Sequence, residues 1–217
     1  MDKQFVVVIG RQFGSGGHAI GVKLAEMLGV PLYDKEILAH IAEEQGITPE
    51  RLHRMDEDLK GNHLLNIGLQ AQKFRPYNIG MLFETDTGAM ISRDQAFRWQ
   101  TEKIRELAEK GSCVIIGRCA DYILREHPGM ISVFITAPLA DREARIARLH
   151  PDHPRENYET HIEFIQKTDK ARANYYSYHT GQQWGDIGNY HLCADSSKLG
   201  IDGTAEMLAD FVKHVLK

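Results

Sequence analysis

Short apolar runs alternate along this chain with longer stretches in which apolar residues recur every three or four positions. The apolar runs have the length and the β-branched content of buried strands, and they cover residues 5–9, 30–33, 113–116, 131–135 and 190–194. The periodic stretches predict helices over residues 18–28, 35–45, 92–110, 121–125, 156–176 and 203–216, with further helices starting at 48 and 137. Strands that alternate with helices predict an α/β fold with a parallel sheet.

Two parts of the chain depart from this pattern. From about residue 56 to 90 the periodicity is lost and glycine and proline accumulate, which predicts an insertion between core elements. The prolines at 151 and 154 break the helix that starts at 137. With 217 residues, 42 % of them hydrophobic, the chain is long enough for one α/β domain that carries a smaller subdomain.

The first strand runs directly into a glycine-rich stretch, residues 10–18, after which the first helix begins. A strand, a glycine loop and a helix start direct several backbone N–H groups and the positive end of a helix dipole at one point, which predicts a phosphate site. In the P-loop pattern G-x-x-x-x-G-K-[ST], Gly16 fits the second glycine. Arg11, Gly17 and His18 then stand at the positions of the first glycine, the lysine and the hydroxyl residue.

A dinucleotide-binding turn is a second interpretation of the same loop. Gly14, Gly16 and Ala19 satisfy G-x-G-x-x-G/A, and Asp34 lies where a ribose-binding acid is expected. Residues 11–13, however, separate the strand from Gly14 and require a wider loop. This spacing favours a phosphate cradle over a dinucleotide turn or an ordinary packing turn. The predicted phosphate-binding residues are Gly14, Ser15, Gly16, Gly17 and His18.

Composition limits the remaining classes of function. A formal charge of −4 provides no overall attraction for nucleic acid or acidic membranes, so neither is an expected partner. Cys113, Cys119 and Cys193 have neither zinc-site spacing nor the density of a disulfide scaffold, and we expect reduced thiols and no protein-held metal site. No apolar run is long enough to cross a bilayer, and no secretory leader is recognisable. We therefore expect a cytoplasmic protein.

Four motifs, in this order along the chain, resemble the cytidylate kinase-like family. They cover residues 11–17, 32–38, 116–124 and 169–176. The resemblance implies a P-loop NTPase-type three-layer sandwich with a central parallel sheet, in a single domain over residues 1–217. It also implies a helical acceptor-binding insertion over 56–98 and a lid over 145–180. Gly17 departs from the lysine that cytidylate kinases carry in this loop.

Phosphoryl transfer depends mainly on alignment and on the neutralisation of charge, so arginines are the candidate catalytic residues. Arg11 lies inside the loop and could reach a β- or γ-phosphate in place of the lysine; the alternative is a solvated loop arginine. Arg145 and Arg148 resemble lid arginines that would close on the triphosphate. Because acidic residues alternate with them, both could instead belong to an ordinary charged helix surface.

Four residues are candidates for binding the acceptor. Arg118 leaves the end of a buried strand, where a guanidinium could hold an acceptor phosphate with two hydrogen bonds. The resemblance implies that Asp169 and Arg172 hold the acceptor, although three-residue spacing also permits an ion pair between them. Asp34 could contact the acceptor or magnesium-bound water, or cap the next helix. Near the end of the predicted helix over 156–176, Tyr175, Tyr176 and Tyr178, together with Trp184, could stack on a base. We favour packing in the core as their role.

The family resemblance implies a kinase that moves the γ-phosphate of ATP to a nucleoside monophosphate, with CMP or dCMP as acceptor. ATP and Mg²⁺ are the expected cofactors and small-molecule nucleotides the expected partners. Phosphates and water would hold the metal, because no aspartate signature follows the strand at 113–116. The alternatives are a kinase for another small phosphorylated or hydroxyl acceptor, a nucleotide-binding module with weak catalysis, and a dehydrogenase.

Overall fold

The computed structural model describes residues 4–34, 36–46, 82–84, 90–149 and 160–217. Its main sheet has five strands in the order β2-β5-β1-β6-β7, and all neighbouring strands pair in parallel. The strands are β1 (Val6–Arg11), β2 (Leu32–Tyr33), β5 (Cys113–Ile116), β6 (Met130–Thr136) and β7 (Leu192–Asp195). A separate antiparallel pair joins β3 (Leu82–Glu84) to β4 (Met90–Ser92). The predicted α/β fold with a parallel sheet is confirmed.

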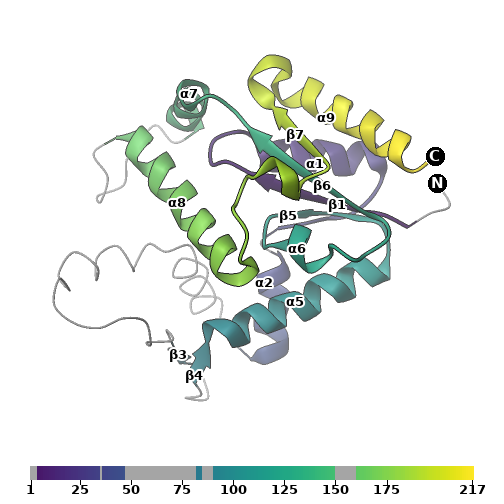
Figure 1. Ribbon diagram of the computed structural model, residues 1–217, viewed down its shortest axis with the longest axis vertical. Helices are drawn as coiled ribbons and strands as arrows, with labels where there is room; N and C mark the ends of the chain where they lie inside the picture. Colours follow the sequence, from purple (N-terminus) through teal and green to yellow (C-terminus); the bar gives the residue numbers. More distant parts are fainter. Residues whose placement is uncertain (1–3, 35, 47–81, 85–89, 150–159) are drawn as a thin grey trace.

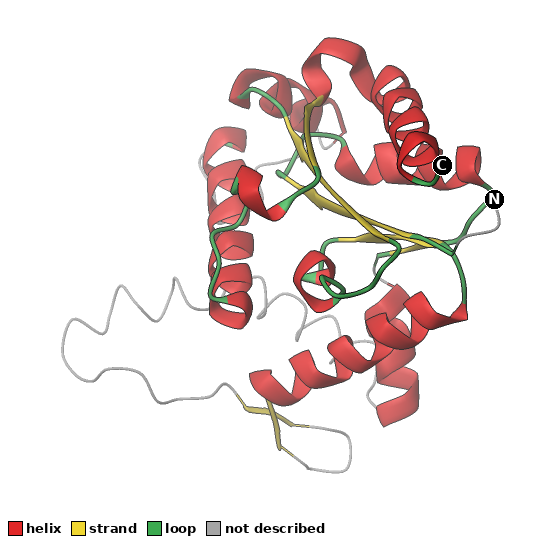
Figure 2. Cartoon of the chain, turned by 45° about the vertical axis from the view of Figure 1, so that its right-hand side comes forward, coloured by secondary structure: helices red, strands yellow, loops and turns green. Residues whose placement is uncertain are grey.

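Helices cover both faces of the main sheet and form a three-layer sandwich, which Figure 2 shows nearly edge-on. One layer contains α1 (Gly17–Leu28) and α9 (Ser196–Val215), and the other contains α2 (Glu36–Gln45), α5 (Arg93–Lys110) and α6 (Ala120–Ile123). Two more helices, α7 (Leu139–Leu149) and α8 (His161–Thr180), lie beside the edge of the sheet where β1 and β6 end (Figure 1). A 3₁₀ turn, η1 (Ile187–Asn189), precedes β7.

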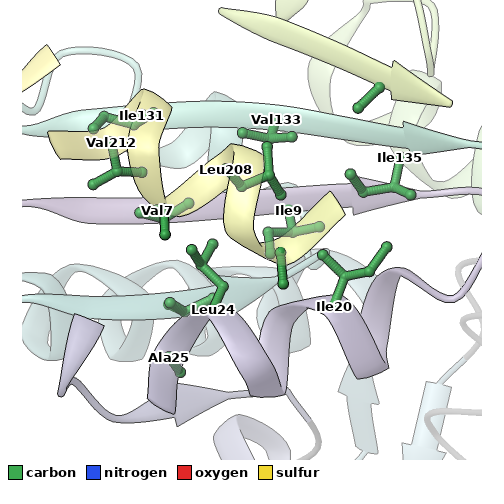
Figure 3. Close-up of a cluster of buried hydrophobic side chains, with 14 of the residues drawn as sticks. Val7, Ile9, Ile20, Leu24, Ala25, Ile131, Val133, Ile135, Leu208 and Val212 are labelled. Carbon is green, nitrogen blue, oxygen red and sulfur yellow. The ribbon is translucent and has the colours of Figure 1, made fainter. Parts of the chain in front are cut away.

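The alternation of side chains along β1 divides the core into two clusters. Val7 and Ile9 face α1 and α9, where Figure 3 shows them packed against Ile20, Leu24 and Leu208. Val6 and Val8 face the opposite layer. Each of these side chains is fully buried, and burial of one such side chain stabilises the fold by about 1.5–3 kcal/mol. The central strands are therefore apolar on both faces, as expected for a covered parallel sheet.

Helix ends differ from the predicted ones where a cap decides the boundary. The last helix, α9, has an extra first turn at Ser196, where the Asp195 carboxylate accepts a 2.8 Å hydrogen bond from the Ser197 N–H. Gly200, with φ 68° and ψ −171°, breaks this helix, and the part after the break agrees with the predicted helix over 203–216. In α8, the Thr160 hydroxyl accepts a 3.1 Å bond from the Glu163 N–H, so this helix starts at His161 instead of 156. The predicted insertion over 56–98 and the helix start at 48 lie largely outside the described residues. Of the predicted lid, residues 150–159 lie outside them too.

Candidate functional site

The glycine loop occupies residues 12–16, between the end of β1 and the start of α1. Gly14 and Gly16 have φ angles of 81° and 82°, which side-chain-bearing residues rarely adopt. A Cβ on Gly16 would lie 2.3 Å from Ile201 Cδ1, so close packing also requires glycine there. The Ser15 N–H and hydroxyl both donate to the Gln12 carbonyl, at 3.3 and 2.8 Å, which closes the turn. The loop is therefore a tight, internally bonded turn.

Backbone donors at the start of α1 are available to a ligand. The first helical bond is donated by the Ile20 N–H to the Gly16 carbonyl, at 2.9 Å. Within the part of the chain that the structure describes, the N–H groups of Gly16, Gly17 and His18 donate to no protein acceptor. Together with the helix dipole, these three donors suit the terminal oxygens of a phosphate chain.

The side chain of Arg11 lies beside this helix start. A Cβ built on Gly17 would be 2.5 Å from Arg11 Cβ and 2.8 Å from Arg11 Cγ. The guanidinium continues towards the end of β5, where a Cβ on Gly117 would be 1.9 Å from Arg11 Nη1. Its Nη2 lies 3.7 Å from Asp34 Oδ1. The structure thus brings Arg11 and the loop together.

Asp34, at the end of β2, connects the arginine to the start of α1. It is 7 % exposed, and its Oδ2 lies 3.0 Å from Nδ1 of the more exposed His18. The carboxylate is therefore held between an imidazole and a guanidinium. Asp34 thus lies close to the start of α1, and its contact with an acceptor or with magnesium-bound water stays a prediction.

Arg118 projects from an unusual turn at the end of β5. Gly117, Arg118 and Cys119 have successive φ angles of 68°, 61° and 55°, and left-handed backbone is costly for the last two residues. Gln100 of α5, only 1 % exposed, donates its Nε2–H to the Arg118 carbonyl at 2.9 Å and so supports the turn. We did not predict a role for Gln100. The sequence feature that could have identified Gln100 is its position: it is a polar residue on the same helix face as the apolar residues Ala96, Ile104 and Leu107.

Asp169 of α8 binds the glycine loop directly. Its Oδ1 accepts a 2.7 Å hydrogen bond from the Phe13 N–H, and its Oδ2 pairs with Nη1 of Arg142 on α7. The same Arg142 nitrogen donates to the Phe13 carbonyl at 3.1 Å. Arg142 is 7 % exposed and was not predicted as a site residue; it shares a helix face with the buried Ile146. Both polar groups of Phe13 are thus held by this ion pair.

Arg172 contacts the same loop one helical turn along α8. Its Nη1–H donates to the Arg11 carbonyl at 3.1 Å, and its guanidinium carbon lies 5.4 Å from the centre of the Phe13 ring. Burial, and then the neighbouring charge of Arg11, lower the pKa of Arg172 to about 9, against the opposing effect of Asp169. In the structure Asp169 and Arg172 hold the loop rather than pair with each other, and their contact with an acceptor stays a prediction.

Arg145 of α7 lies beside Gly16, the last residue of the loop. Its guanidinium carbon would be 3.5 Å from a Cβ built on Gly16. Arg145 and Arg148 are two cationic groups near each other at the end of α7. Partial burial, and then the charge of Arg148, lower the pKa of Arg145. Arg148 is exposed. The start of α1 therefore has the Arg145 guanidinium and the Arg11 side chain beside it.

The aromatic residues near the end of α8 pack mainly into the core. Tyr176 is 3 % exposed and donates its hydroxyl to Asp121 at 2.6 Å, and burial raises the pKa of that carboxyl. Trp184 packs edge-on against Phe134, with ring centres 5.3 Å apart. Of Tyr176, Tyr178 and Trp184, only Tyr178 is exposed. The core-packing interpretation therefore holds for Tyr176 and Trp184.

Backbone N–H groups and guanidinium groups surround the start of α1, and such donors fit the phosphates of a nucleotide. Among the described residues, no three His, Cys, Asp or Glu side chains gather as a metal site. Asp34 is engaged by His18 and Arg11, and Asp169 by the Phe13 N–H and Arg142. Magnesium that arrives with ATP would be held by phosphates and water. No helix of the described chain has the length and apolar content of a membrane span.

This parallel sheet, with its glycine loop at the carboxyl end of β1, defines a kinase-like P-loop protein. The chain belongs to the cytidylate kinase-like family, whose model matches residues 6–198. No curated protein shows significant sequence similarity to it.

Solved structures share the fold. An uncharacterized protein from Eubacterium ventriosum ATCC 27560 is 27 % identical, with a TM-score of 0.67, over 97 % of this chain and 99 % of that chain. The shikimate kinase from Bacteroides thetaiotaomicron is 14 % identical, with a TM-score of 0.55, over 97 % and 99 % of the two chains. The gluconokinase from Sinorhizobium meliloti 1021 is 14 % identical, with a TM-score of 0.52, over 98 % and 96 %.

Proposed function

We propose that the protein is an ATP-dependent kinase that transfers the γ-phosphate to a nucleoside monophosphate, with CMP or dCMP as the acceptor. The observation that carries this proposal is that Arg11 and Arg145 both lie beside the free amides at the start of α1, Arg11 next to Gly17 and Arg145 next to Gly16. Phosphoryl transfer needs cations around the moving group, and one arginine that acts on the transition state accelerates the reaction by about 10³–10⁵.

The donor side of the site consists of the loop and these arginines. The amides of Gly16, Gly17 and His18 would bind phosphate oxygens, and the guanidinium groups would neutralise the charge that spreads over them. Mg²⁺ supplies further neutralisation when it is bound with ATP. Exposed Arg148, beside Arg145, would reach the triphosphate from the end of α7.

The acceptor side would be formed at the neighbouring strand ends. Arg118 leaves β5 next to the Arg11 guanidinium, and a planar guanidinium there can bind the phosphate of a monophosphate with two hydrogen bonds. Asp34 borders the same place at the end of β2. A phosphate-bearing acceptor is therefore favoured over a neutral sugar.

The test measures ADP release from Mg²⁺ and ATP with a panel of acceptors. The panel contains CMP, dCMP, UMP, AMP and GMP, with shikimate and gluconate as hydroxyl acceptors without phosphate. ADP release with one monophosphate supports the proposal, and release with only a hydroxyl acceptor refutes the acceptor class. Thermal stabilisation by ATP without turnover would identify a nucleotide-binding module instead. Stabilisation by NAD but not by ATP would restore the dinucleotide interpretation.

A further inference from the structure

Positions 11 and 17, on either side of the glycine loop in the sequence, have the reverse of the usual arrangement of a glycine and a cationic residue. The structure brings these two positions into contact. In the P-loop pattern the position of Arg11 is a glycine and the position of Gly17 is the lysine. A Cβ on residue 17 would lie 2.5 Å from Arg11 Cβ. This contact involves the base of the arginine side chain, which cannot swing aside as its far end could. An arginine at 11 and a side chain at 17 therefore exclude each other.

A second glycine makes room for the other end of the same side chain. A Cβ on Gly117 would lie 1.9 Å from Arg11 Nη1 and 3.1 Å from its guanidinium carbon. Gly117 also has a φ of 68°, so both backbone conformation and space favour glycine. The arginine thus runs between two positions that have no side chain, one at the start of α1 and one at the end of β5.

Two charged residues hold the arginine along this path. Arg172 donates to the Arg11 carbonyl at 3.1 Å, and Asp34 Oδ1 lies 3.7 Å from Nη2 at the other end. A guanidinium has five N–H donors in a planar fork, so contact with Asp34 is compatible with binding phosphate oxygens. The side chain is therefore placed before any ligand arrives.

We propose that Arg11 is the phosphate-binding cation of this loop in place of the P-loop lysine, and that Gly17 and Gly117 are glycine because the Arg11 side chain occupies the space their side chains would need. Asp34 and Arg172 are then positioning residues for Arg11. The inference rests on the proposed function in one respect, namely that the loop binds the phosphates of ATP.

The decisive experiment restores the usual arrangement of residues. Four proteins are compared: wild type, Arg11→Gly, Gly17→Lys, and the double variant Arg11→Gly/Gly17→Lys. Each is assayed for ADP release and for the affinity of a non-hydrolysable ATP analogue with Mg²⁺. We expect each single variant to lose turnover by at least about 10³-fold, since one guanidinium is worth this much in related reactions. The double variant should regain at least about tenfold over either single variant, because lysine then has both room and a phosphate to bind.

Matched controls separate this effect from general damage. Gly111→Lys adds the same side chain where a Cβ meets nothing within 4 Å, and Arg105→Gly removes an exposed arginine of α5; both should behave as wild type. If the double variant does not fold, as judged by its melting temperature, Arg11→Lys and Arg11→Gln replace it. The lysine variant should bind the analogue more tightly than the glutamine variant.

The outcomes distinguish the inference from the proposed function. If wild type binds the analogue, but no more tightly than Arg11→Gly, the role of Arg11 is overturned, whether or not turnover is found. A double variant no better than the single ones, although folded, overturns the steric coupling, as does wild-type behaviour of Gly17→Lys. Wild type that binds no ATP analogue at all overturns the proposed function itself.

Discussion

Removal of the Asp169 carboxylate should destabilise the protein, because this group holds the buried Arg142 and the half-buried Phe13. In Asp169→Ala the Phe13 N–H loses its acceptor and Arg142 loses its counter-ion. The Arg142 and Asp169 side chains are only 9 % and 17 % exposed, so water replaces the lost contacts poorly. The variant thus leaves a buried positive charge unpaired.

The size of the effect follows from this burial. Breaking a buried ion pair by removing one partner costs about 3–5 kcal/mol, and the partial exposure of Asp169 favours the lower end. We therefore expect the free energy of unfolding to fall by about 3 kcal/mol. At about 2–4 °C per kcal/mol for a chain of this length, the melting temperature should drop by about 6–12 °C. Asp169→Asn keeps an acceptor for the Phe13 N–H and should lose less.

Urea unfolding measures this difference against a surface control. Asp202, whose side chain is 70 % exposed, pairs with Lys23, and Asp202→Ala should cost no more than about 1 kcal/mol. If Asp169→Ala and Asp202→Ala differ by less than about 0.5 kcal/mol, the ion pair does not hold the loop and the reasoning is refuted. The affinity for an ATP analogue, measured on the same proteins, should fall only for the Asp169 variants.

Three further predictions concern the acceptor side and the core. Arg118→Ala should raise the KM for the acceptor with little change in the KM for ATP, and an unchanged acceptor KM in a steady-state assay would remove Arg118 from the site. Gln100→Leu leaves the Arg118 carbonyl without its donor; it should lower the free energy of unfolding by about 1–3 kcal/mol and also raise the acceptor KM, whereas exposed Gln166→Leu should change neither. Burial raises the pKa of Asp121 above 3.8, so the folded state binds more protons than the unfolded one. Stability should therefore fall as the pH rises from about 4 through the raised pKa, and Asp121→Asn should remove that fall in urea unfolding at pH 4 to 7; equal slopes for the two proteins would contradict it.

The central strands were predictable because they are apolar on both faces. Runs such as 113–116 and 131–135 coincide with β5 and β6 to within a residue, since burial on both faces makes these runs apolar apart from Ser132. The last strand and helix were predicted less well. Residues 190–191 precede β7, and the turn of α9 between Ser196 and the break at Gly200 depends on an Asp195 cap that we did not use.

The candidate site was predictable in part. The glycine loop, Arg11 and Arg118 follow from local spacing beside a strand end. Gln100 and Arg142 were missed because their partners, Arg118 and Phe13, lie far away in the sequence. For the same reason, the spacing of Asp169 and Arg172 on one helix could not show that both turn towards the loop instead of pairing with each other.

Local sequence by itself determined where the strands and most helices lie and where the glycine loop forms, because periodicity and glycine content act over a few neighbouring residues. The tertiary structure alone decided that Arg11 fills the space beside Gly17 and Gly117, and that α8 holds Phe13. The physical reason is that van der Waals exclusion and buried hydrogen bonds depend on distance in space, which the order of the strands in the sheet sets.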